Sequence, residues 1–249
     1  METPILIILF IFGAIFGSFF NVVIYRLPKK ESIVHGSSHC PKCMVSITPY
    51  DLIPILSYLF LKGKCRQCKE PISWRYPLIE FITALSFVLV YLQYGYSYFT
   101  IIGILLASIL IIVTMIDIDT MEIYDRFQIM ILTLAFGMLL ISPLPLLDHL
   151  IGFFVISVPF YLIAYLTGGI GGGDIKLIAV AGLLLGYKAT LIAFFIASIL
   201  GGSVAVYLLL TKQKERKSLI AFGPYLCVGI YLAYLYGTDL WNWYLNLFA

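Results

Sequence analysis

Charged residues are scarce in this sequence, in which Asp, Glu, Lys and Arg together make up 12% of 249 residues. Soluble globular domains usually carry about 25% charged residues, and the mean hydropathy of +1.01 points in the same direction. This composition excludes an ordinary soluble globule and indicates a protein embedded in a lipid bilayer. The net charge of +3 by itself says little about partners, and no nucleic-acid partner is expected.

Three further absences narrow the possibilities. The first apolar run, residues 4–25, has no basic segment before it and no small-residue cleavage site after it, so we interpret it as a spanning helix rather than a removed signal peptide. No internal repeat, low-complexity stretch or extended linker is visible, which argues against a transporter built from repeated halves. The motif GxxxxGK[ST] is also missing, which excludes a phosphate-binding loop of that type.

Apolar runs near the roughly 20 residues that cross a bilayer recur along the chain. They cover residues 4–25, 78–93, 99–116, 127–141, 149–166, 190–210 and 219–235, with a shorter run at 175–187. Backbone amides in hydrocarbon must be satisfied within their own segment, so the runs predict helices. The sequence therefore predicts an all-α polytopic membrane protein with about eight transmembrane helices.

The basic residues predict the orientation of these helices. Residues 26–75 carry nine of the 16 Lys and Arg residues, and a later loop adds Lys212, Lys214, Arg216 and Lys217. Eight crossings place both loops on one side, which the positive-inside rule makes cytoplasmic, with the N-terminus outside. We expect a first transmembrane helix at 1–25, a cytoplasmic loop at 26–76 and a seven-helix membrane domain at 77–249.

Four of the five cysteines lie in this first loop, as CPKC (Cys40, Cys43) and CRQC (Cys65, Cys68). The spacing suits one structural Zn²⁺ held by four thiolates. Incidental thiols or redox pairs are the alternatives, but a reducing cytoplasm disfavours disulfides. A loop this polar cannot bury a sufficient core, so the metal would supply its stability. Cys227 is expected to be a small buried apolar residue.

Acidic residues gather at the ends of two predicted helices. Asp117, Asp119, Glu122 and Asp125 lie in MIDIDTMEIYD, and Asp174 follows the glycine-rich stretch TGGIGGG; topology places both groups on the cytoplasmic face. Two carboxylates that share a proton can activate water and polarise a carbonyl, as aspartic proteases do. Alternatively, Asp125 and Asp174 cap helices that begin at residues 126 and 175. The glycines leave room for a passing peptide, or form a hinge or a close helix contact.

Six blocks in this order carry a resemblance that runs nearly end to end. They are GSFFNVVIYRLP from Gly17, the two CxxC pairs, ISWRYPLIE from Ile72, the DIDTMEIYD block, GGGDIKL and FGPYL from Phe222. The sequence resembles the bacterial type IV prepilin peptidases, a GxGD-type family of membrane aspartic proteases. The resemblance implies that Asp117 and Asp174 are catalytic and that Asp119 and Asp125 support them. One departure is Tyr124, where the family commonly has proline.

The same resemblance implies a bifunctional enzyme of the bacterial inner membrane whose active site faces the cytoplasm. It would cut type IV prepilin or pseudopilin precursors after a glycine that ends a short basic leader, and then methylate the new N-terminal residue, typically Phe, with S-adenosylmethionine. Candidate residues for the methyl-transfer region are Asn21, Arg26, Arg75 and Glu80. Interfacial anchoring by the arginines and interhelical hydrogen bonds by Asn21 and Glu80 are the alternatives. A peptidase without methyl transfer and a metal or ion transporter are the competing functions.

Overall fold

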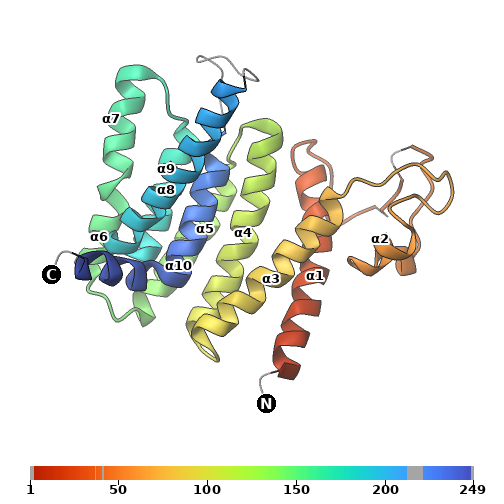
Figure 1. Ribbon diagram of the computed structural model, residues 1–249, viewed down its shortest axis with the longest axis horizontal. Coiled ribbons are helices and arrows are strands. Elements are labelled where there is room, and N and C mark those ends of the chain that lie inside the picture. Colours follow the sequence, from red (N-terminus) through yellow and green to blue (C-terminus); the bar gives the residue numbers. More distant parts are fainter. Residues whose placement is uncertain (1–2, 37, 41, 212–220, 248–249) are drawn as a thin grey trace. The chain divides into compact units, whose positions relative to one another are not determined.

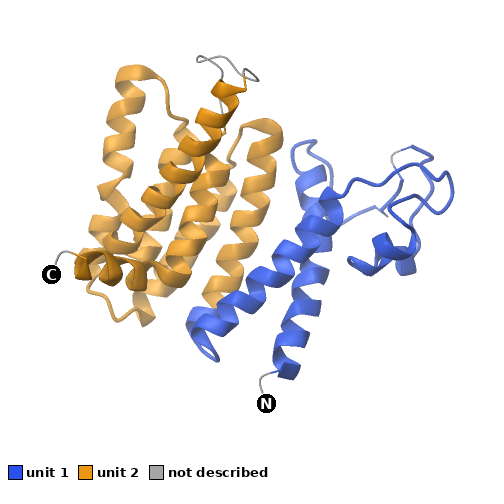
Figure 2. Ribbon diagram, in the orientation of Figure 1, with its two compact units in different colours: residues 1–100 blue, residues 101–249 orange. Residues whose placement is uncertain are grey.

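The computed structural model describes residues 3–36, 38–40, 42–211 and 221–247, which fall into two compact units, 1–100 and 101–249 (Figure 2). The first unit contains helices α1 (Thr3–Arg26), α2 (Leu56–Phe60) and α3 (Arg75–Tyr94), with a 3-10 turn at Pro49–Leu52 (Figure 1). Helix α4 (Tyr98–Thr120) opens the second unit. It is followed by α5 (Asp125–Ile141), α6 (Leu146–Val155), α7 (Ser157–Thr167), α8 (Gly172–Leu185), α9 (Tyr187–Leu210) and α10 (Gly223–Asn246).

The all-helical prediction is confirmed, since no strand occurs in the part of the chain that the structure describes. Five segments are long and apolar enough to cross a membrane: Thr3–Arg26, Arg75–Tyr94, Tyr98–Thr120, Leu146–Thr167 and Tyr187–Leu210. The chain is therefore a multi-pass membrane protein. Helices α5, α8 and α10 overlap the other three predicted runs, and α5 and α8, with 17 and 14 residues, are short. The count of eight crossings stays a prediction, as does the division at residues 25 and 76.

In the first unit, α1 and α3 pack closely through glycines one turn apart. A Cβ added to Gly13 would lie 2.6 Å from the Ala84 Cα, and one added to Gly17 would lie 2.6 Å from the Glu80 Cα. Apolar side chains gain little from meeting each other in hydrocarbon, so small residues that let two backbones approach are a main source of helix association there. This contact fixes the register between Asn21 on α1 and Glu80 on α3.

In the second unit, α8 is the most enclosed helix described, and every residue from Leu177 to Leu185 is buried. It meets α6 at Gly152 and Gly182, where a Cβ on either residue would overlap the carbonyl oxygen of the other. The buried ring of His149 joins the same helices, because its Nδ1 lies 2.8 Å from the Leu183 carbonyl oxygen. These contacts explain how a helix too short to span a bilayer unaided is held among its neighbours.

The predicted run at 149–166 forms two helices instead of one. The helix is interrupted at Ile156, whose φ of −109° departs from the usual helical value of about −63° while its ψ of −35° stays helical. Pro159 explains the break, because it has no N–H to donate to the carbonyl of Val155, the last residue of α6. Figure 1 shows α7 inclined away from the other helices of its unit. Most of its side chains are exposed, among them Tyr161, Leu162 and Tyr165.

Candidate functional site

Asp117 lies in the last turn of α4 and is only 5% exposed. Its Oδ2 atom is buried and accepts no hydrogen bond from the residues that the structure describes. This oxygen faces Gly223, the first residue of α10, so closely that a Cβ there would overlap it. A buried carboxylate oxygen without a donor is unfavourable in a folded protein. Its presence marks this position as a candidate for chemistry.

Asp174 lies in the first turn of α8 and is partly buried. The two acids lie near each other, because Gly223, which faces the Asp117 carboxylate, and Gly173, which precedes Asp174, both lie against the Ile123 side chain. The end of α4 and the starts of α8 and α10 all lie at the end of this unit that is uppermost in Figure 1. The structure thus brings together the two acids that the sequence places fifty-seven residues apart.

The predicted helix caps at Asp125 and Asp174 are wrong. Helix α5 begins at Asp125 itself and α8 begins at Gly172, so both acids are inside their helices. The capping positions are taken by Tyr124 and Gly171, and neither makes a side-chain capping hydrogen bond. An acid in the first helical turn is still favoured by the positive end of the helix dipole. Asp174 therefore needs no capping role to be stable in its place.

Asp125 instead pairs with Lys176, whose Nζ lies 2.7 Å from the Asp125 Oδ1 atom. A second contact joins the same helices, because the Gln128 side-chain amide donates to the Gly173 carbonyl at 3.2 Å. Together they tie the start of α5 to the start of α8 beside Asp174. This link could not be predicted from the sequence, because no local pattern pairs two residues 51 positions apart. Asp119 and Glu122 are exposed.

Glycine is favoured at two positions of the run before Asp174 for different structural reasons. Gly168 adopts φ of 65° and ends α7 with its N–H bonded to the Ala164 carbonyl, a geometry that favours glycine. A Cβ on Gly173 would lie 3.0 Å from the Ile123 Cβ, so this glycine lets the connection between α4 and α5 approach α8. The run is thus a left-handed helix end followed by a close contact.

The four loop cysteines form a cluster in the first unit. Their sulfur atoms all lie within 4.8 Å of one another, and the Cys40 and Cys68 sulfurs are 3.8 Å apart. Four thiol ligands at this separation fit a tetrahedral Zn²⁺ site. The predicted metal-binding set of Cys40, Cys43, Cys65 and Cys68 is therefore assembled by the fold, and it is a zinc-type site.

The two cysteine pairs lie on matching backbone turns. Antiparallel bridges close them at His39 and Ser46 and at Lys64 and Pro71. In each turn the residue after the second cysteine is left-handed, with φ of 59° at Met44 and 60° at Lys69. Such turns aim backbone amides at the sulfurs.

The electrostatics of the cluster favour a cation. Hydrogen bonds from the Cys43 and Lys42 backbone lower the pKa of the Cys40 thiol to about 6. At Cys68 the Glu70 backbone amide also favours the thiolate, but desolvation and the neighbouring thiols outweigh it and raise the pKa to about 11. One thiolate therefore forms readily, and a bound cation is required to keep all four cysteines in the thiolate form.

A cavity of about 450 Å³ lies beside the cysteine cluster, within the first unit. Three of the four candidate methyl-transfer residues line it, namely Asn21, Arg26 and Glu80, together with Cys40 and Cys65. Arg75 is not among the lining residues. Asn21 donates to the Tyr76 carbonyl at 3.2 Å, and this contact holds α1 against α3.

Arg26 and Glu80 each organise the loop around the cavity. The Arg26 guanidinium donates to the carbonyls of Ser32, His35 and Gly36 at 2.9–3.1 Å, so it folds the start of the loop back onto α1. Glu80 is 7% exposed, and its Oε2 accepts the Ile55 amide at 2.7 Å. The bonds of Arg26 show a more specific role than interfacial anchoring.

Other charged residues near the cavity are paired. Arg66 binds Asp51 with two nitrogens, at 2.9 and 2.6 Å, and holds the pKa of the Asp51 carboxyl below its usual value. Lys42 lies 3.7 Å from Glu70. The remaining basic residues predicted for the same face, Lys212, Lys214, Arg216 and Lys217, lie outside the described residues.

Comparison with known protein families finds two that match this chain. "Bacterial Peptidase A24 N-terminal domain" matches residues 11–94, and "Type IV leader peptidase family" matches residues 104–206. Each match falls within one of the two compact units. No solved structure matches this chain.

Curated relatives extend the similarity over nearly the whole chain. The Prepilin leader peptidase/N-methyltransferase of Bacillus subtilis (strain 168) is 40% identical over 245 residues, covering 96% of this chain and 98% of its own. The protein of the same name from Neisseria gonorrhoeae is 35% identical, with 95% and 93% covered. Because the similarity runs through both units at this level, the chain belongs to the prepilin leader peptidase/N-methyltransferase family.

Proposed function

We propose that this protein cleaves the leader from type IV prepilin-like precursors after a glycine and methylates the newly exposed N-terminal residue, typically Phe. Its membership of the family supports both activities. The observation that carries the peptidase half is the pairing of Asp117 with Asp174 at one end of the second unit, where Asp117 keeps a buried oxygen without a donor.

Asp117 and Asp174 are the proposed catalytic pair. Two neighbouring carboxylates in a poorly solvated site hold one proton between them. The ionised member takes a proton from water, the water oxygen attacks the peptide carbonyl carbon, and the protonated member donates to the carbonyl oxygen. Collapse of the tetrahedral intermediate breaks the C–N bond as the amine receives a proton. No metal or covalent intermediate is needed for this sequence.

The cavity in the first unit is the proposed site of methyl transfer. S-adenosylmethionine supplies the methyl group there, carried on a sulfonium with a positive charge. Glu80 suits this ligand, because it is a buried carboxylate that lines the cavity and forms no ion pair with a described residue. Asn21 and Arg26 hold the cavity walls, and Arg75 is retained only as a flanking candidate. The amine must be neutral and in line with the methyl group.

The cysteine cluster would serve this half as a structural zinc site. All four positions are taken by protein thiols, so no ligand position is left for a substrate. The metal holds together the loop that carries Asp51, Cys40 and the other lining residues of the cavity.

The proposed topology has eight crossings, with α6 and α7 counted as one. This number places the cysteine loop and the acids on the cytoplasmic side of the bacterial inner membrane, with the N-terminus outside. The excess of Lys and Arg in residues 26–75 supports this orientation. Lipid is then a permanent partner of the exposed apolar helix faces.

Conversion of each acid to its amide tests the peptidase half. Purified Asp117→Asn and Asp174→Asn variants, in liposomes with a prepilin-like precursor, should lose at least roughly 10³-fold in cleavage rate, because neither amide can exchange the shared proton. Asp239→Asn, an exposed acid further along α10, is the matched control and should cleave normally.

The same reaction, followed by mass spectrometry of the product N-terminus with and without S-adenosylmethionine, tests the methylation half. A mass increase of one methyl group is expected only with the methyl donor. Cleavage without that increase would leave a peptidase alone, and normal cleavage by both amide variants would reject the catalytic pair.

A further inference from the structure

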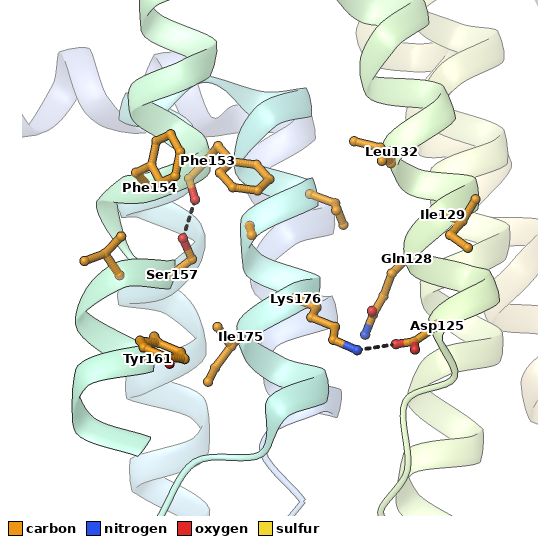
Figure 3. Close-up of a pocket in the computed structure, with 13 residues that line it drawn as sticks. Asp125, Gln128, Ile129, Leu132, Phe153, Phe154, Ser157, Tyr161, Ile175 and Lys176 are labelled. Atoms are coloured by element: carbon orange, nitrogen blue, oxygen red, sulfur yellow. Dashed lines mark hydrogen bonds and ion pairs between the residues drawn. The ribbon is translucent and has the colours of Figure 1, made fainter. Parts of the chain in front are cut away.

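An apolar groove of about 550 Å³ lies in the second unit, beside the candidate peptidase site. Figure 3 shows α8 as its floor, between α5 on one side and α6 with α7 on the other. Ile129 and Leu132 line it from α5, Val158 and Tyr161 from α7, and Ala179 and Val180 from α8. The mechanism above gives this groove no role.

The groove exists because α7 does not continue the line of α6. The break at Ile156 inclines α7 away from α8, so side chains such as Tyr161 and Val158 stay 61% and 45% exposed. Residues of α5, α6, α7 and α8 line the opening.

One end of the groove is polar and adjoins the catalytic pair. The ion pair between Asp125 and Lys176 lies at this end, as does the side chain of Gln128 (Figure 3). The Gln128 amide donates to the Gly173 carbonyl. Ile175, which lines the groove, directly follows Asp174 in the chain. This end of the groove therefore lies within one helical turn of Asp174 along α8.

We propose that this groove seats the apolar helix that follows the cleavage point in the precursor. This inference rests on the proposed function. The family resemblance implies a precursor with a short basic leader that ends in glycine, followed by an apolar helix. The enzyme offers a matching order, because the exposed acids Asp119 and Glu122 follow Asp117 in the chain and the groove begins at the ion pair between Asp125 and Lys176. The acids would face the basic leader, and the groove would face the apolar segment.

Hydrocarbon contact alone cannot select a protein helix, because lipid tails are as apolar as leucine. Selection must come from shape and from the polar end. The small side chain of Ala179 at the floor permits close approach, and the diverging α7 leaves a concave wall that a rigid helix fills better than mobile chains. We therefore expect the groove to contribute to substrate affinity and little to the chemical step.

Filling the groove from its exposed walls tests this inference. Ile129→Trp and Val158→Trp should each raise KM for a full-length precursor by roughly tenfold with kcat nearly unchanged, an effect equal to about 1.4 kcal/mol. Phe195→Trp, at an equally exposed position on α9, is the matched control and should leave KM unchanged. A short peptide that spans the scissile bond but lacks the apolar helix should be cleaved equally by all four proteins.

Photo-crosslinking gives the second measurement. The crosslinking residue p-benzoylphenylalanine at Tyr161 should capture the precursor, while the same residue at Phe195 should capture only lipid. Lipid capture at both positions, together with equal KM values, would overturn the groove as a substrate site. Absence of any cleavage by the unmodified enzyme would instead reject the proposed function, so the two failures are distinguishable.

Discussion

At the scale of single residues, Gly223 shows how a small side chain protects the catalytic pair. It begins α10 and lies against the Asp117 carboxylate, where a methyl group has no room. Gly223→Ala should therefore displace Asp117 and lower kcat/KM for precursor cleavage by roughly 10²-fold, while overpacking costs about 1–3 kcal/mol of stability. Cleavage kinetics and thermal unfolding in the same detergent measure both.

The matched control is Gly202→Ala in α9, since a Cβ there meets no atom within 4 Å. This variant should keep full activity and gain slightly in stability, because alanine favours a helix. Equal activity of the two variants would show that Asp117 tolerates displacement and that its placement beside Gly223 is incidental.

The sequence predicted that Asp117 and Asp174 lie on one face, from the expected alternation of crossings, and the structure places the two acids at the same end of the second unit. The unpartnered oxygen of Asp117 and its contact with Gly223 could not be predicted, although Gly223 lies within the quoted block FGPYL. Such contacts depend on distances between helices, which no local pattern encodes.

At the scale of helices, every predicted apolar run overlaps a described helix, and five helical segments are long and apolar enough to cross a membrane, but the internal irregularities were not predicted. The break at Ile156 follows from Pro159, a signal that was visible in the sequence and yet compatible with a kinked single helix. The link from Asp125 to Lys176 was hidden for another reason, since Asp125 alone suggested a helix cap and 51 positions separate it from Lys176. Pairings of this kind emerge only when α5 and α8 are placed side by side.

The contact between α1 and α3 yields a prediction at this scale. Gly17→Ala adds a methyl group 2.6 Å from the Glu80 Cα and should force the helices apart. Because Asn21 and Glu80 line the cavity from these two helices, methylation should fall severalfold more than leader cleavage, with a loss of about 1–3 kcal/mol in stability. Mass spectrometry of product N-termini separates the two activities.

Gly137→Ala in α5 is the corresponding control, because its Cβ would meet no atom within 4 Å. Both activities should stay at the unmodified level in this variant. A parallel loss of cleavage and methylation in Gly17→Ala would show that the α1 and α3 contact supports the whole protein rather than the cavity.

At the scale of the whole molecule, the two compact units divide the proposed chemistry. Residues 1–100 hold the cysteine cluster and its cavity, and residues 101–249 hold both proposed catalytic acids and the groove. Each unit also carries its own family match. Loss of one activity without the other is therefore expected when damage is confined to one unit.

Metal removal is the sharpest test of this division. Four thiolates are held together only by a cation, so a strong chelator, or Cys40→Ser combined with Cys65→Ser, should release about one Zn²⁺ per chain and disorder the cavity walls. Methylation should fall by at least roughly tenfold while leader cleavage is retained, and added zinc should restore the chelated enzyme. Neither proposed catalytic acid belongs to the cysteine cluster. A parallel loss of cleavage and methylation would therefore mean that the cluster supports both units.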